Sequence, residues 1–299
     1  KKPLVITVSV LFLLALVVGC SKPATPTEAP VESRPMSREI GIASISPSDA
    51  GNARFIAAME KAAKEIGWTV TVVDCHGSAD EANAAFTNFA TKGVDFVVEV
   101  AFPATSLATG LKSTADAGIP VVTLGGGGGY GVYLVTGSGG PHATPVVEQM
   151  VADLDGKGEV LALTYRAGQV CLDRENIFDD IVSKYPDIKV TKNEVRIPGY
   201  LQDAAAYAIA WLASRPEGES NYAIWGCWDE PTVGAISSLK QLGRTDVKTY
   251  GQNGTQDAIR AILEGSMTAT AWEDTAAEAV KIVEILSQMD YDSFDPNAP

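Results

Sequence analysis

The side chains in this sequence that could carry catalysis stand apart from one another. His76 and His142 are its two histidines, and they lack the spacing of metal ligands or of a hydrolase triad. Cys171 has no histidine near it in the sequence to activate its thiol. The residue types therefore predict a protein that is not an enzyme and that holds neither a metal ion nor a cofactor.

One glycine run fits a cofactor motif. Gly126, Gly128 and Gly131 match G-x-G-x-x-G, the dinucleotide-binding fingerprint. That fingerprint opens a helix whose N-terminus receives pyrophosphate, whereas VYLVT after Gly131 is a strand pattern. We therefore reject a dinucleotide site and interpret the run as a pliable loop that lets the backbone approach a ligand.

The first twenty residues indicate export from the cytoplasm. Lys1 and Lys2 precede an apolar run over 4–19, which is typical of a secretory signal and shorter than the roughly 20 residues that span a bilayer. Because Cys20 directly follows Gly19, the segment is similar to a bacterial lipoprotein signal. We expect Cys20 to be lipidated and the protein to be held at the outer face of a membrane or in the periplasm.

Composition indicates how the chain is divided into segments and which partners are unfavourable. Residues 21–38 are rich in proline and small polar residues, which predicts a flexible tether. The chain from residue 39 onward is long enough for two medium domains. A formal net charge of -14 and a pI of about 4.6 argue against nucleic acid, whose phosphates would be repelled.

Cysteine usage leaves one question open. With Cys20 assigned to lipid, Cys75, Cys171 and Cys227 remain, and an odd number excludes a complete disulfide framework. The sequence favours small buried thiols near strand ends, but it does not decide whether Cys171 and Cys227 pair.

Apolar residues recur from residue 39 onward with the periods of alternating strands and helices. The expected strands are 39–45, 68–73, 96–100, 120–124, 132–136, 160–164, 189–195, 222–225, 247–251 and 267–272. The expected helices are 52–66, 80–91, 106–117, 141–154, 172–185, 203–214, 231–242 and 255–264. This alternation predicts an α/β fold with two Rossmann-like lobes of parallel, doubly wound sheets, and a ligand cleft beyond the carboxyl ends of their strands.

Several segments resemble the type I periplasmic binding proteins, specifically the ribose-binding-like branch that serves sugar ABC transporters. The resemblance is carried by RFIAAMEKAAKEIGWTVTVVD, GIPVVTLGG, LDRENIFDDIVSKYPDIKV and AIWGCWDEPTVGAISSLKQLGRTDVKTYGQNGTQDAIRAILEGSMTATAWED. It implies an N-terminal lobe of 39–137 plus 274–290, a C-terminal lobe of 138–273 and a tail of 291–299. Crossings are expected near 136–138 and 272–275, while the third crossing usual in this branch is in doubt.

The resemblance also implies ligand-binding positions in the second lobe. Arg174 in LDRENIF occupies the place of an arginine that binds sugar hydroxyls, which suits its five fixed donors. Trp228 stands where the family commonly has a ligand-binding asparagine, and Asn253 stands where it has an aspartate. The family's hinge glutamine falls on Glu273 or, with a one-residue slip, on Trp272.

The first lobe departs from the pattern. Sugar binders of this branch follow the PVVTL-type strand with Asp-Arg, whereas here Leu124 runs into Gly125–Gly129. The candidates to replace the Asp-Arg pair in binding the ligand are Asp49, Asn52, Glu99 and Phe102. If the glycines replace the pair, Asp and Arg restored at Gly125 and Gly126 are expected to alter ligand preference.

Aromatic residues near predicted strand ends offer faces on which a ring can lie. They are Tyr165, Trp225, Trp228 and Trp272. A sugar ring fits such faces, and so does a nucleoside or another aromatic solute.

The resemblance implies a monomeric solute-binding lipoprotein that captures a small polar ligand, foremost a sugar, and delivers it to an ABC permease. A nucleoside or aromatic-solute binding protein and a ligand-sensing subunit of a membrane receptor remain as alternatives. A sugar-responsive transcription factor would need a DNA-binding segment where this chain has a lipid signal.

Overall fold

The computed structural model describes residues 37–297. The predicted signal with Cys20, the predicted tether up to residue 36 and the last two residues of the predicted tail lie outside the described residues. No helix between residues 37 and 297 is long and apolar enough to cross a membrane.

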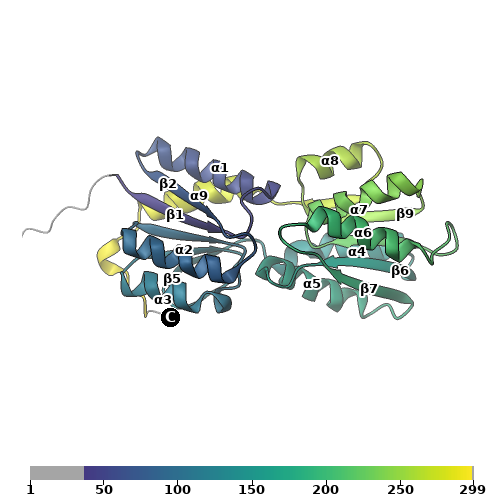
Figure 1. The fold of residues 1–299 in the computed structure, drawn as a ribbon, viewed down its shortest axis with the longest axis horizontal. Coiled ribbons are helices and arrows are strands. Elements are labelled where there is room, and N and C mark those ends of the chain that lie inside the picture. The colour runs from purple at the N-terminus through teal and green to yellow at the C-terminus, as the bar shows by residue number, and fades with distance from the viewer. Residues whose placement is uncertain (1–36, 298–299) are drawn as a thin grey trace, which may run out of the picture. The chain divides into compact units, whose positions relative to one another are not determined.

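The first lobe is built on a parallel sheet in the order β2-β1-β3-β4-β5. Helices α1 and α9 pack together on one side of the sheet, and α2 and α3 pack together on the other (Figure 1). Its strands are β1 (Glu39–Ser44), β2 (Thr69–Asp74), β3 (Phe96–Val100), β4 (Val121–Leu124) and β5 (Val132–Thr136), and its helices are α1 (Ala50–Glu65), α2 (Ala79–Lys92), α3 (Ala108–Asp116) and α9 (Thr275–Ser287).

The second lobe repeats this architecture, with a parallel sheet in the order β10-β9-β8-β6-β7. Its strands are β6 (Gly158–Thr164), β7 (Ile188–Glu194), β8 (Tyr222–Gly226), β9 (Val247–Asn253) and β10 (Ala269–Trp272). Its helices are α4 (Thr144–Asp153), α5 (Gln169–Val182), α6 (Tyr200–Leu212), α7 (Asp229–Leu242) and α8 (Gln256–Leu263). The predicted α/β fold with two parallel, doubly wound lobes is confirmed.

Strands that are apolar throughout explain why both faces of each sheet are covered. In β1, Ile40 and Ile42 belong to the buried cluster under α1 and α9, while Ala43 belongs to the cluster on the opposite face. Successive side chains of a strand point to opposite faces, so such a run can be buried only between two layers of helices.

Some helix boundaries differ from the expected positions. Helix α1 begins at Ala50 because Asp49 caps it, with Oδ1 accepting a hydrogen bond from the Gly51 N–H at 3.2 Å. Helix α5 begins at Gln169, three residues earlier than expected, and α9 was not assigned from the periodicity. Helix α9 buries Ile282 and Leu286 against α1 and so belongs to the first lobe.

The described chain passes from the first lobe to the second after β5 and returns after β10. Beyond α9, the Tyr291 ring lies 5.0 Å from that of Phe96, and its hydroxyl donates to the Asp95 carbonyl oxygen at 3.0 Å. Gly131 N–H donates to the Pro296 carbonyl oxygen at 3.2 Å. Residues 291–297 therefore pack against the first lobe.

The glycine run forms the loop between β4 and β5, so a strand follows it, as expected. A Cβ at Gly125 would collide with a methyl group of Val170 from the second lobe. A Cβ at Gly126 would collide with the Glu99 carboxylate and would lie 2.6 Å from the Phe102 carbonyl oxygen. Aspartate and arginine therefore do not fit at these two positions, and the exchange suggested by the sequence cannot test ligand preference.

Gly126→Ala is expected to lower the free energy of unfolding by about 1–3 kcal/mol, because an added methyl overpacks the buried loop. Gly128→Ala is the matched control, since the nearest atom to its Cβ would be a Val135 methyl at 4.0 Å. Urea denaturation of both variants measures the effect. Equal stabilities would contradict this account of the loop.

Candidate ligand-binding site

A cavity of about 700 Å³, open solvent at its mouth included, lies where the carboxyl ends of the strands of both lobes meet. The loop after β1, the ends of β3 and β4 and both crossing segments contribute to it from the first lobe and the hinge. The start of α5 and the ends of β6, β8 and β9 contribute from the second lobe. This is the place where open α/β sheets bind ligands.

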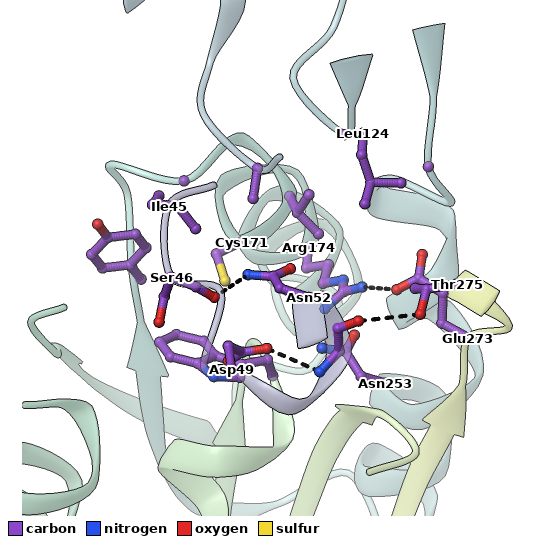
Figure 2. A pocket seen from close by; sticks show the side chains of 18 of the residues that line it. Ile45, Ser46, Asp49, Asn52, Leu124, Cys171, Arg174, Asn253, Glu273 and Thr275 are labelled. Atoms are coloured by element: carbon purple, nitrogen blue, oxygen red, sulfur yellow. Dashed lines mark hydrogen bonds and ion pairs between the residues drawn. The ribbon is translucent and has the colours of Figure 1, made fainter. Parts of the chain in front are cut away.

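The cavity brings together most of the residues predicted from the sequence (Figure 2). Those that line it are Asp49, Asn52, Tyr165, Arg174, Trp228, Asn253 and Glu273. Phe102 and Trp272 are not among its lining residues, and neither are the candidates Glu99 and Trp225, which are fully buried.

Phe102 and Trp272 make their contacts outside the cavity. Phe102 is 1% exposed and packs in the apolar core, and its N–H donates to the buried Glu99 carboxyl group. Trp272 is 57% exposed, and the Arg54 guanidinium lies over its ring. The guanidinium carbon is 4.4 Å from the centroid of the Trp272 ring. Since neighbouring side chains point in opposite directions at the end of β10, Glu273 rather than Trp272 faces the cavity.

A buried ion pair forms the polar end of the cavity. Arg174 is 1% exposed, and its Nη2 lies 3.0 Å from Oε2 of Glu273 while its Nη1 donates to the Cys227 carbonyl oxygen at 2.9 Å. Burial raises the pKa of Glu273, but the Arg174 charge and hydrogen bonds from Ser138 outweigh it and leave that pKa lowered. The pair therefore stays charged, and its two charges balance.

Two polar atoms of this end have no hydrogen-bond partner. Within residues 37–297, Nε of Arg174 and Oδ1 of Asn253 are buried without a hydrogen-bond partner. Asn52 is engaged, since its Nδ2 donates to the Ser46 carbonyl oxygen at 2.9 Å. A ligand with both donors and acceptors would satisfy the free atoms, whose burial is otherwise unfavourable.

Direct contacts join the two lobes beside the cavity. Arg54 on α1 donates from Nη2 to the carbonyl oxygens of Asn253 at 3.1 Å and Glu273 at 2.7 Å. The Ala50 N–H donates to Oε1 of Glu230 at 2.9 Å. Burial raises the pKa of Asp49, and burial followed by the Asp49 carboxylate raises the pKa of Glu230. The contact surface between the lobes therefore favours protonated carboxyl groups.

Sequence reasoning missed the apolar part of the lining. Ile45, Ala101, Leu124 and Val170 line the cavity, together with Cys171. The first three stand at or directly after the ends of β1, β3 and β4, so the rule that ligands bind beyond strand ends could have found them.

The cysteines of the described residues, Cys75, Cys171 and Cys227, are buried and free in the structure. Burial and then the neighbouring Cys171 thiol raise the pKa of Cys227. Among residues 37–297, no group of three or more His, Cys, Asp or Glu side chains is arranged to hold a metal ion.

The fold and the cavity define a two-lobed α/β protein with a cavity lined by both lobes. The profile of the family described as periplasmic binding protein domain matches residues 40–290. The chain belongs to this family, and the predicted resemblance is confirmed.

Curated relatives and solved structures are also similar to this chain. The chain is 28% identical to a xylitol-binding protein of Mycolicibacterium smegmatis over 62% of this chain, and it spans only 54% of that relative. It is 22% identical to the ribose import binding protein RbsB of Escherichia coli over 71% of each chain. Similar structures are an ABC sugar transporter subunit from Rhodobacter sphaeroides (25% identity, TM-score 0.77, 84% of this chain and 91% of that one) and an ABC transporter solute binding protein from Agrobacterium vitis with bound allitol (26%, 0.78, 84% and 89%).

Glu230→Gln is expected to raise the Tm at about pH 8 to 9 and to change it little near pH 5. A carboxyl whose folded pKa is raised contributes stability below its ordinary pKa of 4.5 and loses it as the pH rises toward about 9. Glutamine keeps the acceptor for the Ala50 N–H but carries no proton to lose. Each 1 kcal/mol gained corresponds to about 2–4 °C.

Thermal unfolding across this pH range measures the effect, with Glu60→Gln on the exposed side of α1 as the control. Parallel curves for the wild-type protein and Glu230→Gln would show that the contact between the lobes does not favour the protonated carboxyl.

Proposed function

We propose that this protein is an extracytoplasmic solute-binding protein that captures a sugar or polyol between its lobes and delivers it to an ABC importer. The observation that carries the proposal is the buried guanidinium of Arg174, placed in a cavity to which both lobes contribute. The names of the relatives, which bind xylitol, ribose or allitol, support the same class of ligand.

The charge balance of the cavity favours a neutral ligand. Glu273 already neutralises Arg174, so an anionic ligand would have to compete with a buried carboxylate for the same guanidinium. A hydroxyl group can accept from Nε of Arg174 and donate to Oδ1 of Asn253 without disturbing the pair. Vicinal hydroxyls of a sugar or polyol supply several such groups.

Closure of the lobes over the ligand is the proposed working step. A ligand that touches both lobes favours the closed state by the contacts that it makes only there. A shift from 1:99 to 99:1 needs about 5.5 kcal/mol of differential affinity, which a few hydrogen bonds to Arg174, Asn253 and Asp49 supply. No covalent chemistry is part of this function.

The remaining parts of the proposal concern the membrane. Lipidation of Cys20 would hold the protein at the membrane surface, and residues 21–38 would leave the lobes free to reach the permease as a monomer. Acyl attachment is measured by mass spectrometry of the protein produced in a bacterial host, with Cys20→Ala as the control.

A thermal-shift screen tests the proposed function. A ligand at 100 times its Kd stabilises the folded protein by about 2.7 kcal/mol, so a sugar or polyol is expected to raise the Tm by several degrees. Nucleosides and aromatic acids form the second arm of the screen. A shift with those compounds alone would contradict the proposal and support an aromatic-solute binding protein.

Arg174→Ala is expected to weaken the best sugar or polyol found in that screen by about 10- to 100-fold, because a charged hydrogen-bond donor is lost. Arg260→Ala is the control, since that guanidinium is exposed on α8 and paired with Asp257. Isothermal titration calorimetry of both variants measures the difference. Unchanged affinity in Arg174→Ala would place the ligand elsewhere.

A further inference from the structure

The residues that the first lobe presents to the cavity at the ends of β3 and β4 are apolar, and at the end of β1 an apolar residue precedes Ser46. Ile45 follows β1, Ala101 follows β3, and Leu124 and Gly125 lie at the end of β4. Figure 2 shows Ile45 and Leu124 in the upper part of the view, apart from Asp49, Asn253 and Glu273 below.

The backbone N–H groups of Ile45, Ala101 and Gly125 are occupied as well. The Ala101 N–H donates to the Leu124 carbonyl oxygen at 3.1 Å, and the Ala101 carbonyl oxygen accepts from the Gln169 N–H at 3.1 Å. The N–H groups of Ile45 and Gly125 donate to carbonyl oxygens of β3 and β5, at 3.2 and 2.8 Å. A ligand hydroxyl placed here would find none of these donors free.

Val170 completes the apolar wall from the second lobe. It is the second residue of α5, lines the cavity, and places a methyl group where any side chain at Gly125 would begin. At Gly125 the loop after β4 therefore has room only for backbone atoms, which lie against the aliphatic side chain of Val170. The polar side chains that also line the cavity are Ser46, Asp49, Asn52, Ser138, Arg174, Asn253, Glu273 and Thr275.

We propose that the solute is amphipathic: a sugar or polyol in which a methyl or other alkyl group replaces one hydroxyl-bearing end and lies against Leu124, Ala101 and Val170. The inference rests on the proposed function and narrows its ligand class, with Val170 as the residue that sets the specificity. A hydroxyl against this wall would lose its hydrogen bonds to water without replacement, whereas a methyl group gains by burial.

Calorimetric titration of matched pairs tests this inference. L-Fucose and L-galactose, L-rhamnose and L-mannose, and fucitol and galactitol differ only by a methyl group in place of a hydroxymethyl group. In at least one pair, the dissociation constant of the deoxy compound is expected to be lower than that of its parent by a factor of about 10 or more.

Val170→Thr is the matched variant, because threonine has nearly the same shape and brings a hydroxyl to the wall. It is expected to reduce the preference for the deoxy compound by about 5-fold or more. Val280→Thr, at a half-exposed position on α9, is expected to leave the preference unchanged.

The outcomes separate the two proposals. If parent compounds bind as tightly as their deoxy partners, or if Val170→Thr leaves the ratio unchanged, the inference is wrong while the proposed function stands. If no sugar or polyol binds at all, the proposed function fails and the inference with it.

Discussion

The ion pair between Arg174 and Glu273 is the interaction on which the rest of the site depends. Arg174 comes from α5 in the second lobe, and Glu273 comes from the segment that returns the chain to the first lobe. Ser138, on the outgoing segment, donates to the same carboxylate. Burying either charge alone would be strongly unfavourable, so the pair and its hydrogen bonds hold both crossing segments and the cavity floor in one arrangement.

One side of the cavity is apolar and the other is polar, because different residues lie behind each side. Behind the glycine loop, the buried Glu99 carboxyl, whose pKa burial raises well above its ordinary value, binds the Phe102 N–H and leaves no room for a side chain at Gly126. The loop can therefore present only its backbone to the cavity, and Val170 lies beside it. On the other side, Arg174 and Asn253 each carry a buried polar atom without a hydrogen-bond partner.

Charge also shapes the contact between the lobes. Glu230 receives the first N–H of α1, where the partial positive charge of the helix N-terminus favours a carboxylate, yet Asp49 lies close enough to oppose a second negative charge. The same contact is thus stabilised by a hydrogen bond and opposed by repulsion between carboxylates. Burial and the Asp49 carboxylate accordingly raise the pKa of Glu230.

Local periodicity determined the fold in this chain, because apolar runs such as 96–100 and 120–124 can be satisfied only by a parallel sheet with helices on both faces. The resemblance to the family pointed to Arg174 and Asn253, which do line the cavity, and it left the hinge position open between Trp272 and Glu273. Only the tertiary structure decided that Phe102 turns into the core, that Glu273 and not Trp272 faces the cavity, and that Val170 fills the space beside Gly125. The reason is that the direction of a side chain depends on what it packs against, and contacts across the lobes, such as that between Val170 and Gly125, are recorded in no local pattern.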